Sequence, residues 1–346
     1  MSGSKGEVLV TGANGYIGAR TVGAFLDAGY SVRGTVRSSS AAESLLEALP
    51  DAVSNGRLKI DQVPDITAPG AFDKAVRGVT AIVHLATPVS FFFTNSEYIV
   101  GTAVNGVKAI LESATKEPRI KHFLLMSSIA AIISEKQQGH VFTETDWNDA
   151  AARIVAEQGD QAPSRQIYGA SKVLAEREFW KFMQERQPKF TMNAINPVLV
   201  GGPPLVLPST PDKLNESVSF IWQVLSGQGI PENLVGFGAY VDVRDVARLA
   251  VFSVEHGNQV NAQRYMAASG WASPQAAADV LRQKYPGWKD SIQKGAPQSN
   301  YLPGYKYPPQ APQIDASKAV RATGQGWIRF DDMVVDTAEV FKAYLE

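Results

Sequence analysis

A tyrosine and a lysine that could work together stand four residues apart in the run Tyr168-Gly-Ala-Ser-Lys172. On a helix this spacing puts both side chains on one face, so the phenol and the ammonium lie close together. A free tyrosine has a pKa near ~10, and a cationic neighbour lowers that pKa because it favours the phenolate. The pair could therefore serve acid–base chemistry. Because such pairs are common on surface helices, the prediction needs support from the rest of the chain.

A glycine-rich turn supplies that support. The segment Thr11-Gly12-Ala-Asn-Gly15-Tyr-Ile-Gly18 leads from a predicted strand into a helix that ends near Gly29. In such a turn one glycine permits the reversal, a second lets backbone N–H groups approach a pyrophosphate, and a third lets the helix pack closely. A Walker-type site is excluded, because no Gly-Lys-Ser/Thr follows. The turn predicts dinucleotide binding, with a plain strand-to-helix connection as the alternative.

The elements that must position these residues alternate between short β-branched runs and helical stretches up to about residue 200. This pattern is typical of a parallel sheet covered by helices. We therefore predict an α/β fold, a doubly wound parallel sheet of the Rossmann type, with ligands at the carboxyl ends of its strands. The predicted strands are residues 8–10, 31–36, 58–60, 81–85, 122–126 and 191–195.

The character of the chain changes after residue 200, where prolines and glycines multiply. The length of 346 residues also exceeds the size at which a single core usually stops growing. We predict a dinucleotide-binding domain over residues 1–200, to which residues 238–265 return. A smaller, mixed C-terminal lobe over residues 201–237 and 266–346 is expected to bind the substrate.

The G-x-x-G-x-x-G spacing followed by Tyr-x-x-x-Lys resembles the short-chain dehydrogenase/reductase superfamily in its extended form. The resemblance implies that Tyr168 donates a proton and that Lys172 lowers the tyrosine pKa and holds the nicotinamide ribose. It also implies that Ser128, at the end of the fifth strand, orients a carbonyl group, with Ser127 as the alternative if the register is off by one. The hydride would come from the cofactor.

The end of the second strand predicts which cofactor binds. An acidic residue there would bind the ribose 2′-hydroxyl of NAD, whereas a basic residue favours the 2′-phosphate of NADP. The chain has Thr35-Val-Arg37-Ser38-Ser39 and no carboxylate. We predict NADP(H), with Arg37 as the phosphate anchor because its planar guanidinium matches a phosphate bidentately, and with Ser38 assisting. The alternative for Arg37 is a solvated surface charge.

Further cofactor contacts follow from the resemblance. Residues 65–66 would contact the adenine, residues 85–87 would pass the ribose and pyrophosphate, and Pro197 and Val200 in the segment 196–203 would pack on the nicotinamide. The role of Asn105 stays open between water binding and packing. The predicted cofactor set comprises Thr11, Gly12, Asn14, Gly15, Tyr16, Ile17, Gly18, Arg37, Ser38, Asp65, Ile66, Leu85, Ala86, Thr87, Tyr168, Lys172, Pro197 and Val200.

Within the family, the segments at residues 35–37, 84–88, 144–148 and 168–172 are most similar to the dihydroflavonol reductase-like subgroup, and there to fungal NADPH-dependent aldehyde and ketone reductases. This similarity implies reduction of a bulky or aromatic carbonyl compound, including ketoesters, to an alcohol. Apolar loops past the strand ends would form the pocket. The predicted substrate contacts are Val89, Phe91, Phe92, Ile129, Leu205 and Trp222, with core packing as the alternative.

Three other functions are weighed against reduction. A hydroxysteroid-type dehydrogenase would differ mainly in direction and cofactor preference. A sugar-nucleotide epimerase or dehydratase would use the same residues, usually with NAD and a pocket rich in arginine and lysine. An NADP-sensing regulatory protein would usually lack the tyrosine or the lysine, and this chain keeps Ser128, Tyr168 and Lys172.

The composition of the chain limits which ligands, metals and cellular locations we expect for this protein. With 33 basic against 34 acidic residues there is no electrostatic footprint for nucleic acid or an anionic membrane. The absence of cysteine excludes disulfides and thiolate sites, and the four histidines have no metal-binding spacing, so we expect no metal. Neither a leader nor an apolar run of ~20 residues is visible. We expect a cytoplasmic monomer or homodimer whose partner is a small carbonyl substrate.

Overall fold

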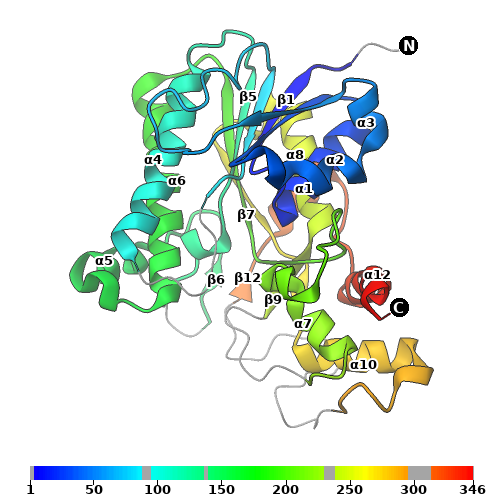
Figure 1. Cartoon of the computed structure of the whole chain (residues 1–346). Coiled ribbons are helices and arrows are strands. Elements are labelled where there is room, and N and C mark those ends of the chain that lie inside the picture. Colours follow the sequence, from blue (N-terminus) through cyan, green and yellow to red (C-terminus); the bar gives the residue numbers. More distant parts are fainter. Residues whose placement is uncertain (1–3, 88–94, 136–138, 230–237, 295–312, 346) are drawn as a thin grey trace.

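The computed structural model describes residues 4–87, 95–135, 139–229, 238–294 and 313–345. Its centre is a sheet of seven parallel strands in the order β10-β7-β5-β4-β1-β2-β3 (Figure 1). All six predicted strands are present with small shifts at their ends, and β10 joins beside β7. The strands are β1 (Glu7–Thr11), β2 (Ser31–Val36), β3 (Leu58–Gln62), β4 (Ala81–His84), β5 (His122–Met126), β7 (Thr191–Pro197) and β10 (Gln263–Ala267). The predicted doubly wound parallel fold is confirmed.

Helices cover both faces of this sheet. On one face lie α1 (Tyr16–Asp27) and α8 (Val243–Glu255), and on the other α4 (Ser96–Ala114) and α6 (Ser164–Arg186) (Figure 1). Because strand side chains alternate between faces, Val10 joins the core under α1 and α8, and its neighbour Leu9 joins the core under α4 and α6. Burial on both faces explains the apolar runs in the central strands β1, β4 and β5.

Shorter elements surround the main sheet. The chain forms a two-stranded parallel pair, β6 with β12, and several one- to three-turn helices that connect or cap the larger elements. These short elements are α2 (Glu43–Ala48), α3 (Pro50–Ser54), β6 (Val141–Phe142), α5 (Asp149–Gln158), α9 (Gly257–Val260), β12 (Gln313–Ile314) and α11 (Ser317–Thr323).

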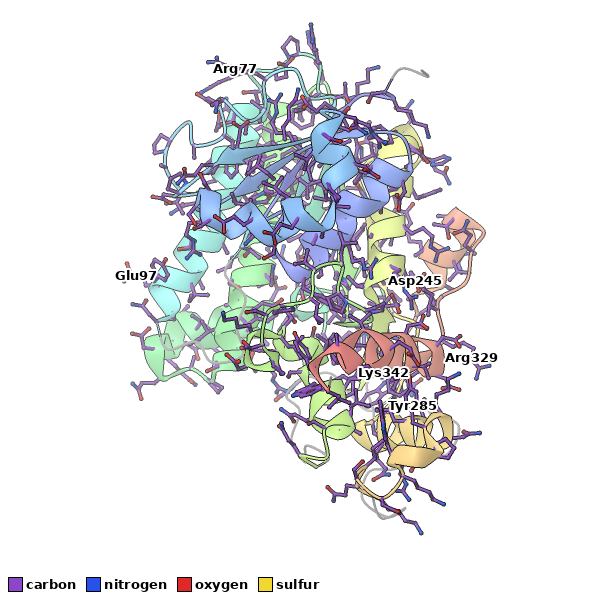
Figure 2. All side chains as sticks on the ribbon, turned by 45° about the vertical axis from the view of Figure 1, so that its right-hand side comes forward. Arg77, Glu97, Asp245, Tyr285, Arg329 and Lys342 are labelled. Carbon is purple, nitrogen blue, oxygen red and sulfur yellow. The ribbon has the colours of Figure 1, made fainter. Side chains whose placement is uncertain are left out.

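A second apolar core holds the smaller lobe together. It contains a three-stranded sheet, β8 (Leu199–Gly201), β9 (Ala239–Asp242) and β11 (Gly270–Trp271), and the helices α7 (Glu216–Leu225), α10 (Pro274–Lys284) and α12 (Phe330–Phe341). Large buried side chains such as Phe220, Phe330 and Phe341 fill it. On its surface the Lys342 ammonium lies 4.4 Å from the centroid of the Tyr285 ring, and both residues are labelled in Figure 2.

The elements of residues 238–265, the segment predicted to return to the main sheet, belong partly to the main sheet and partly to the small one. Helix α8 packs against α1, and β10 pairs with β7 at the edge of the main sheet. Strand β9 between them pairs instead with β8 and β11 in the small sheet. The chain therefore crosses between the two parts repeatedly, and the domain boundaries stated above stay a prediction.

Helix α1 is tied to the chain that enters the lobe. The Tyr16 hydroxyl donates to the Gly202 carbonyl at 2.7 Å, and Arg20 donates to the carbonyls of Pro203 and Pro204 at 2.9 and 3.2 Å. These bonds hold residues 202–204 against the first turns of the helix that follows the glycine-rich turn. The two halves of the cleft described below are thereby fixed to each other.

His122 on β5 is buried in the sheet. Its Nδ1 contacts the Thr191 hydroxyl at 2.7 Å and its Nε2 contacts the side-chain Oδ1 of Asn193 at 2.8 Å, and both partners lie on neighbouring β7. Burial lowers the pKa of His122 from 6.5 to about 4, and the hydrogen bond to Asn193 opposes this effect. The ring is therefore neutral in the folded protein at neutral pH.

We predict that His122 makes the protein less stable as the pH falls. Because the folded-state pKa is about 4 and the ordinary value is 6.5, the unfolded chain binds more protons below pH 6.5, and stability is lost as the pH falls from there toward 4. A His122→Gln variant should therefore show a shallower decrease of its melting temperature between about pH 7 and 5. The exposed His256, changed to Gln, serves as control, and equal slopes in both variants would contradict the prediction.

Candidate active site

The glycine-rich turn forms a cradle at the carboxyl end of β1. Gly12 has a φ of +65°, and a Cβ there would lie 3.3 Å from the backbone of Ala86. A Cβ on Gly18 would lie 2.1 Å from the Gly12 carbonyl oxygen, which no side chain can tolerate. Helix α1 begins at Tyr16, so the free N–H groups and positive end of its dipole face the turn. The turn thus leaves room for a pyrophosphate beside a helix N-terminus.

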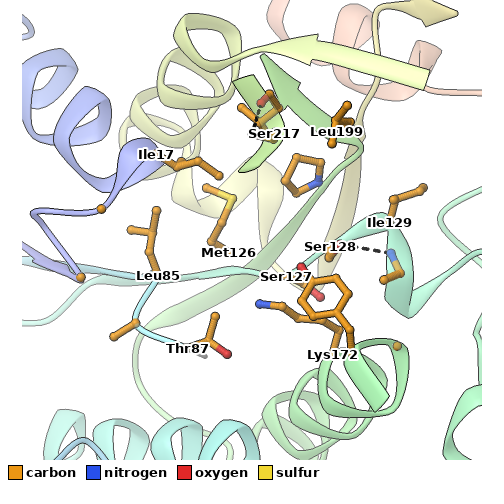
Figure 3. A pocket seen from close by; sticks show the side chains of 18 of the residues that line it. Ile17, Leu85, Thr87, Met126, Ser127, Ser128, Ile129, Lys172, Leu199 and Ser217 are labelled. Atoms are coloured by element: carbon orange, nitrogen blue, oxygen red, sulfur yellow. Dashed lines mark hydrogen bonds between the residues drawn. The ribbon is translucent and has the colours of Figure 1, made fainter. Parts of the chain in front are cut away.

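A cleft of about 1700 Å³ runs along this edge of the sheet. Chain segments that leave the carboxyl ends of β2, β4, β5 and β7 contribute Arg37, Ala86, Ser128 and Pro197 to its walls. This is the edge at which an open parallel sheet binds its ligand. Leu199, on β8, and Ser217, in the first turn of α7, add the wall supplied by the smaller lobe (Figure 3).

Two arginines near the end of β2 differ in availability. Arg33 is committed, since it forms an ion pair with Glu7 at 2.7 Å and donates to the carbonyls of Ala75 and Arg77. Arg37 is exposed at the cleft, and its guanidinium makes no hydrogen bond or ion pair with any residue that the structure describes. Arg37 is therefore the arginine placed to receive an anionic group.

The three predicted catalytic side chains meet where the end of β5 faces α6. Ser128 hydrogen-bonds the Tyr168 phenol, and the Lys172 ammonium lies 5.7 Å from the centroid of the tyrosine ring. The Ser128 Oγ accepts the N–H of Ala130 at 3.1 Å, which orients it at the start of a short 3-10 turn over Ile129–Ala131. Figure 3 shows Ser128 and Lys172 side by side in the cleft.

Burial dominates the acid–base properties of this group. It raises the pKa of the Tyr168 phenol, against the opposing effect of the Ser128 hydrogen bond. The lysine was expected to lower the tyrosine pKa, but desolvation of the phenolate raises it, so the phenol keeps its proton at neutral pH. Burial also lowers the pKa of Lys172 to about 8, although the charge on Glu176 opposes the shift. A protonated phenol beside a lysine that titrates near neutral pH suits a proton donor and its helper.

Beneath the turn, Thr11 and His84 lock the strand ends together. The Thr11 Oγ1 accepts the N–H groups of Leu85 and Ala86, both at 3.0 Å, and lies 2.9 Å from His84 Nδ1. Since these two N–H groups occupy both lone pairs of the hydroxyl, it donates its proton to Nδ1 and places the imidazole proton on Nε2. Burial, with a smaller effect of the Lys172 charge, lowers the pKa of His84 to about 3, so the ring is neutral.

The structure brings most of the predicted site residues into this one cleft. Lining it are Gly12, Asn14, Gly15, Tyr16, Ile17, Gly18, Arg37, Asp65, Ile66, Leu85, Ala86, Thr87, Ser128, Ile129, Tyr168, Lys172, Pro197 and Val200. They come from segments up to 188 positions apart in the chain, from Gly12 to Val200. Asn105, whose role was left open, is exposed on α4.

Four predicted residues lie elsewhere, for identifiable reasons. Thr11 supports the strand ends from below, as described, and the Ser38 hydroxyl faces Ser40 at 3.2 Å. Leu205 packs beside Gly23 on α1, and Trp222 packs edge to face on Tyr344 in the lobe core. We therefore leave Leu205 and Trp222 out of the proposed substrate site. Val89, Phe91 and Phe92 lie outside the described residues.

The cleft also contains residues that sequence reasoning missed. Met126, Ile133 and Ile154 add apolar surface, and Arg153, Arg165 and Gln166 add polar groups beside α6. From the lobe come Leu199, Leu214 and residues 215–217. The only sequence signal among them is Asn215, which caps α7 by accepting the N–H of Ser217 at 3.0 Å and so marks a helix start. The others carry no motif, because folding alone brings them to the site.

The fold and the site define a Rossmann-type protein with a Ser-Tyr-Lys group at the carboxyl edge of its sheet. The family model described as NAD dependent epimerase/dehydratase family matches residues 8–268, and the chain belongs to this family, the extended form of the short-chain dehydrogenases/reductases. The family predicted from the sequence is confirmed.

Named relatives agree with this assignment. NADPH-dependent methylglyoxal reductase GRE2 of Saccharomyces cerevisiae is 31% identical over 347 residues, which cover 96% of this chain and 97% of that protein. Aldehyde reductase 2 of Sporidiobolus salmonicolor is 38% identical over 196 residues, 55% of this chain and 56% of that protein. The crystal structure of yeast methylglyoxal/isovaleraldehyde reductase Gre2 with NADPH matches at a TM-score of 0.82 and 28% identity, over 98% of this chain and 99% of that one. The predicted similarity to fungal NADPH-dependent reductases is confirmed.

We predict that catalysis of carbonyl reduction declines above about pH 8. The Lys172 ammonium must be charged to stabilise the phenolate that forms at Tyr168, and its pKa of about 8 means that this charge is complete below that pH and is lost above it. The rate at saturating NADPH and carbonyl substrate, measured from about pH 6 to 10, should follow this titration. A rate that stays level up to about pH 10 would contradict it.

Proposed function

We propose that this protein is an NADPH-dependent reductase that converts an aldehyde or ketone to the alcohol. The observation that carries the proposal is that the Ser128, Tyr168 and Lys172 side chains meet in the same cleft as the glycine cradle. A reductase needs its proton donor beside its dinucleotide site, and the cleft provides both. The relatives named as NADPH-dependent and aldehyde reductases support the same activity.

The residues of the cleft fit NADPH. Gly12 adopts a φ of +65° and a Cβ at Gly18 would collide with the Gly12 carbonyl oxygen, so this tight glycine turn would leave space for the pyrophosphate at the N-terminus of α1. The exposed Arg37 guanidinium would hold the ribose 2′-phosphate. The Lys172 ammonium makes no hydrogen bond with any residue that the structure describes and would donate to the hydroxyls of the nicotinamide ribose. Bound NADPH supplies the hydride that is added to the carbonyl carbon.

The side chains of this protein handle the oxygen of the carbonyl group. Ser128 accepts the Ala130 N–H and hydrogen-bonds the Tyr168 phenol, and its hydroxyl would donate to the carbonyl oxygen of a bound substrate. Tyr168 then gives its phenolic proton to the oxygen as negative charge develops there, which completes the alcohol. The Lys172 ammonium stabilises the phenolate that remains. The raised tyrosine pKa keeps the phenol loaded with its proton before the reaction.

For the substrate we propose a bulky, largely apolar aldehyde or ketone, with ketoesters included. Ile129 follows Ser128 directly, and Met126, Ile133, Ile154 and Leu199 add apolar surface to the cleft. Such walls bind by excluding water and leave orientation to a few polar groups. Val89, Phe91 and Phe92 remain part of this proposal on sequence grounds.

In the part of the chain that the structure describes, no helix combines the length and the apolar character needed to cross a bilayer. We propose a cytoplasmic location and keep both a monomer and a homodimer open. Among the described residues the large exposed hydrophobic side chains are Val53, Tyr98, Val141 and Leu345, which lie on different elements.

The proposed activity is tested by NADPH consumption. Purified protein should oxidise NADPH when given aromatic aldehydes, aryl ketones, β-ketoesters or methylglyoxal. A Tyr168→Phe variant should bind NADPH normally but lose activity by at least ~10²-fold, because it keeps the ring and loses the proton donor. Tight NADPH binding without consumption of any carbonyl would overturn the reductase proposal in favour of a cofactor-sensing protein or an epimerase.

The cofactor preference is tested separately at Arg37. An Arg37→Ala variant should raise the KM for NADPH by about 10- to 100-fold, the loss expected for charge-assisted hydrogen bonds to a phosphate, and leave the KM for NADH nearly unchanged. Arg77→Ala is the matched control, since Arg77 is also exposed and lies on the opposite edge of the molecule from the lobe (Figure 2). Equal effects on both cofactors would remove Arg37 from the phosphate site.

A further inference from the structure

Glu176 is a fully buried carboxylate close to the proposed active site. It lies on α6 one turn beyond Lys172 and two turns beyond Tyr168, so the three side chains occupy one face of the helix. Its exposed fraction is 0%. Carboxylates are almost never fully buried unless they are paired. The burial of Glu176 therefore requires hydrogen-bonding or charged partners, and its position beside the proposed active site suggests a functional role.

The partners of Glu176 are all hydrogen-bond donors. The Arg264 Nε donates to it at 2.6 Å and Nη2 at 3.4 Å, the Ser127 hydroxyl at 2.6 Å, the Asn196 Nδ2 at 2.7 Å and the Trp180 Nε1 at 3.1 Å. Ser127 directly follows β5, Asn196 lies on β7, Arg264 on β10 and Trp180 on α6 itself. One carboxylate thus joins α6 to three neighbouring strands of the sheet.

Two of these partners lead directly to the reacting groups. Ser127 immediately precedes Ser128, and the Asn196 Nδ2 that reaches Glu176 also donates to the Ser128 carbonyl at 3.1 Å. Asn196 in turn precedes Pro197, in the segment proposed to contact the nicotinamide. The position of Ser128 relative to Tyr168 is therefore set through Glu176.

The Arg264 guanidinium is held away from the lysine. Its Nη1 donates to the carbonyls of Glu144 and Asp146 at 2.8 and 2.7 Å, and its plane stacks on Trp147 at 4.0 Å from the ring centroid. Residues 144–147 thus hold the guanidinium in the position from which it pairs with the Glu176 carboxylate. Buried ion pairs seldom stabilise a fold more than apolar residues of the same size would, so this pair calls for a role beyond stability.

The groups that face Lys172 leave Glu176 as its nearby anion. On α6 they are Tyr168 and Glu176, and from β4 comes His84, whose ring is neutral. Arg264 on β10 stands behind Glu176. A cavity of about 10 Å³, the size of one water molecule, lies among His84, Ser127, Lys172 and Glu176. Bulk solvent therefore does little to screen the attraction between the lysine and the carboxylate.

We propose that Glu176, backed by Arg264, is a positioning residue for the reduction: it keeps Lys172 in its charged form and fixes the strand end that carries Ser128. This inference rests on the proposed function, because it assigns the pair a part in the same reaction. Glu176 opposes the effect of burial on the lysine. Without the carboxylate, Lys172 would lose its charge at a lower pH, and the reaction would lose its upper pH range.

The test compares Glu176→Gln with Arg264→Met and a control. The first variant is nearly isosteric and removes the anion, so the alkaline limb of kcat/KM at saturating NADPH should move down by about one pH unit. The second leaves the anion without its counter-ion, so the limb should move up. Asp245→Asn is the matched control: Asp245 is also buried and accepts from Arg248 and the Ile328 N–H, far from the site, and its limb should stay in place although the fold weakens.

A second readout separates this inference from the proposed function. Trace acetylation of Lys172 by acetic anhydride, measured by mass spectrometry across the pH range, follows the titration of the lysine without any turnover. The acetylation midpoint should shift in the same directions as the kinetic limb, even if no carbonyl is reduced. If Glu176→Gln does not fold, Arg264→Met carries the test alone.

Two results would overturn the inference. One is a Glu176→Gln variant whose rate falls equally at every pH with an unmoved Lys172 midpoint, which would make the residue merely structural. The other is an Arg264→Met variant whose midpoint stays in place or moves down. Failure of the wild-type protein to reduce any carbonyl would count against the proposed function alone.

Discussion

A lysine ammonium held out of water at the carboxyl edge of an apolar sheet is the constraint on which the site depends. Lys172 is 5% exposed, and burial lowers its pKa to about 8, so the protein must supply the support that solvent would have given. That support comes from the geometry around α6. The helix carries Tyr168, Lys172 and Glu176 on one face, and the strand ends β5, β7 and β10 bring their donors to the carboxylate.

The proposed cofactor side of the cleft depends on steric constraints instead. Gly12 adopts a φ of +65°, and any side chain at Gly18 would collide with the Gly12 carbonyl oxygen, so the glycine turn places the N-terminus of α1 at the edge where the strands end. Tyr16 and Arg20 then connect the same helix to residues 202–204 at the entrance to the smaller lobe. One helix therefore faces the proposed pyrophosphate site at its start and holds the entrance to the smaller lobe with its first two turns.

Polar groups that look alike in the sequence have different tasks in the folded protein. Arg33 and Arg37 lie on the same short segment. Arg33 forms an ion pair with Glu7 and donates to two backbone carbonyls, whereas Arg37 faces the cleft. Ser127 and Ser128 are neighbours, yet extended backbone turns one hydroxyl toward Glu176 and the other toward Tyr168. Alternation of side chains along a strand end produces this division of labour.

The sequence by itself determined the parallel fold and the glycine-rich turn, and it predicted the trio of Ser128, Tyr168 and Lys172 and an anion-binding site at Arg37. Each of these depends on local chemistry: the period of apolar residues, glycines that no other residue can replace, and a four-residue spacing on a helix. Only the tertiary structure decided that Leu205 and Trp222 pack elsewhere, that β9 belongs to the small sheet, and that Glu176 pairs with Arg264, 88 residues away. These outcomes depend on which distant segments come into contact, and contacts between distant segments leave no periodic or local signal in a single sequence.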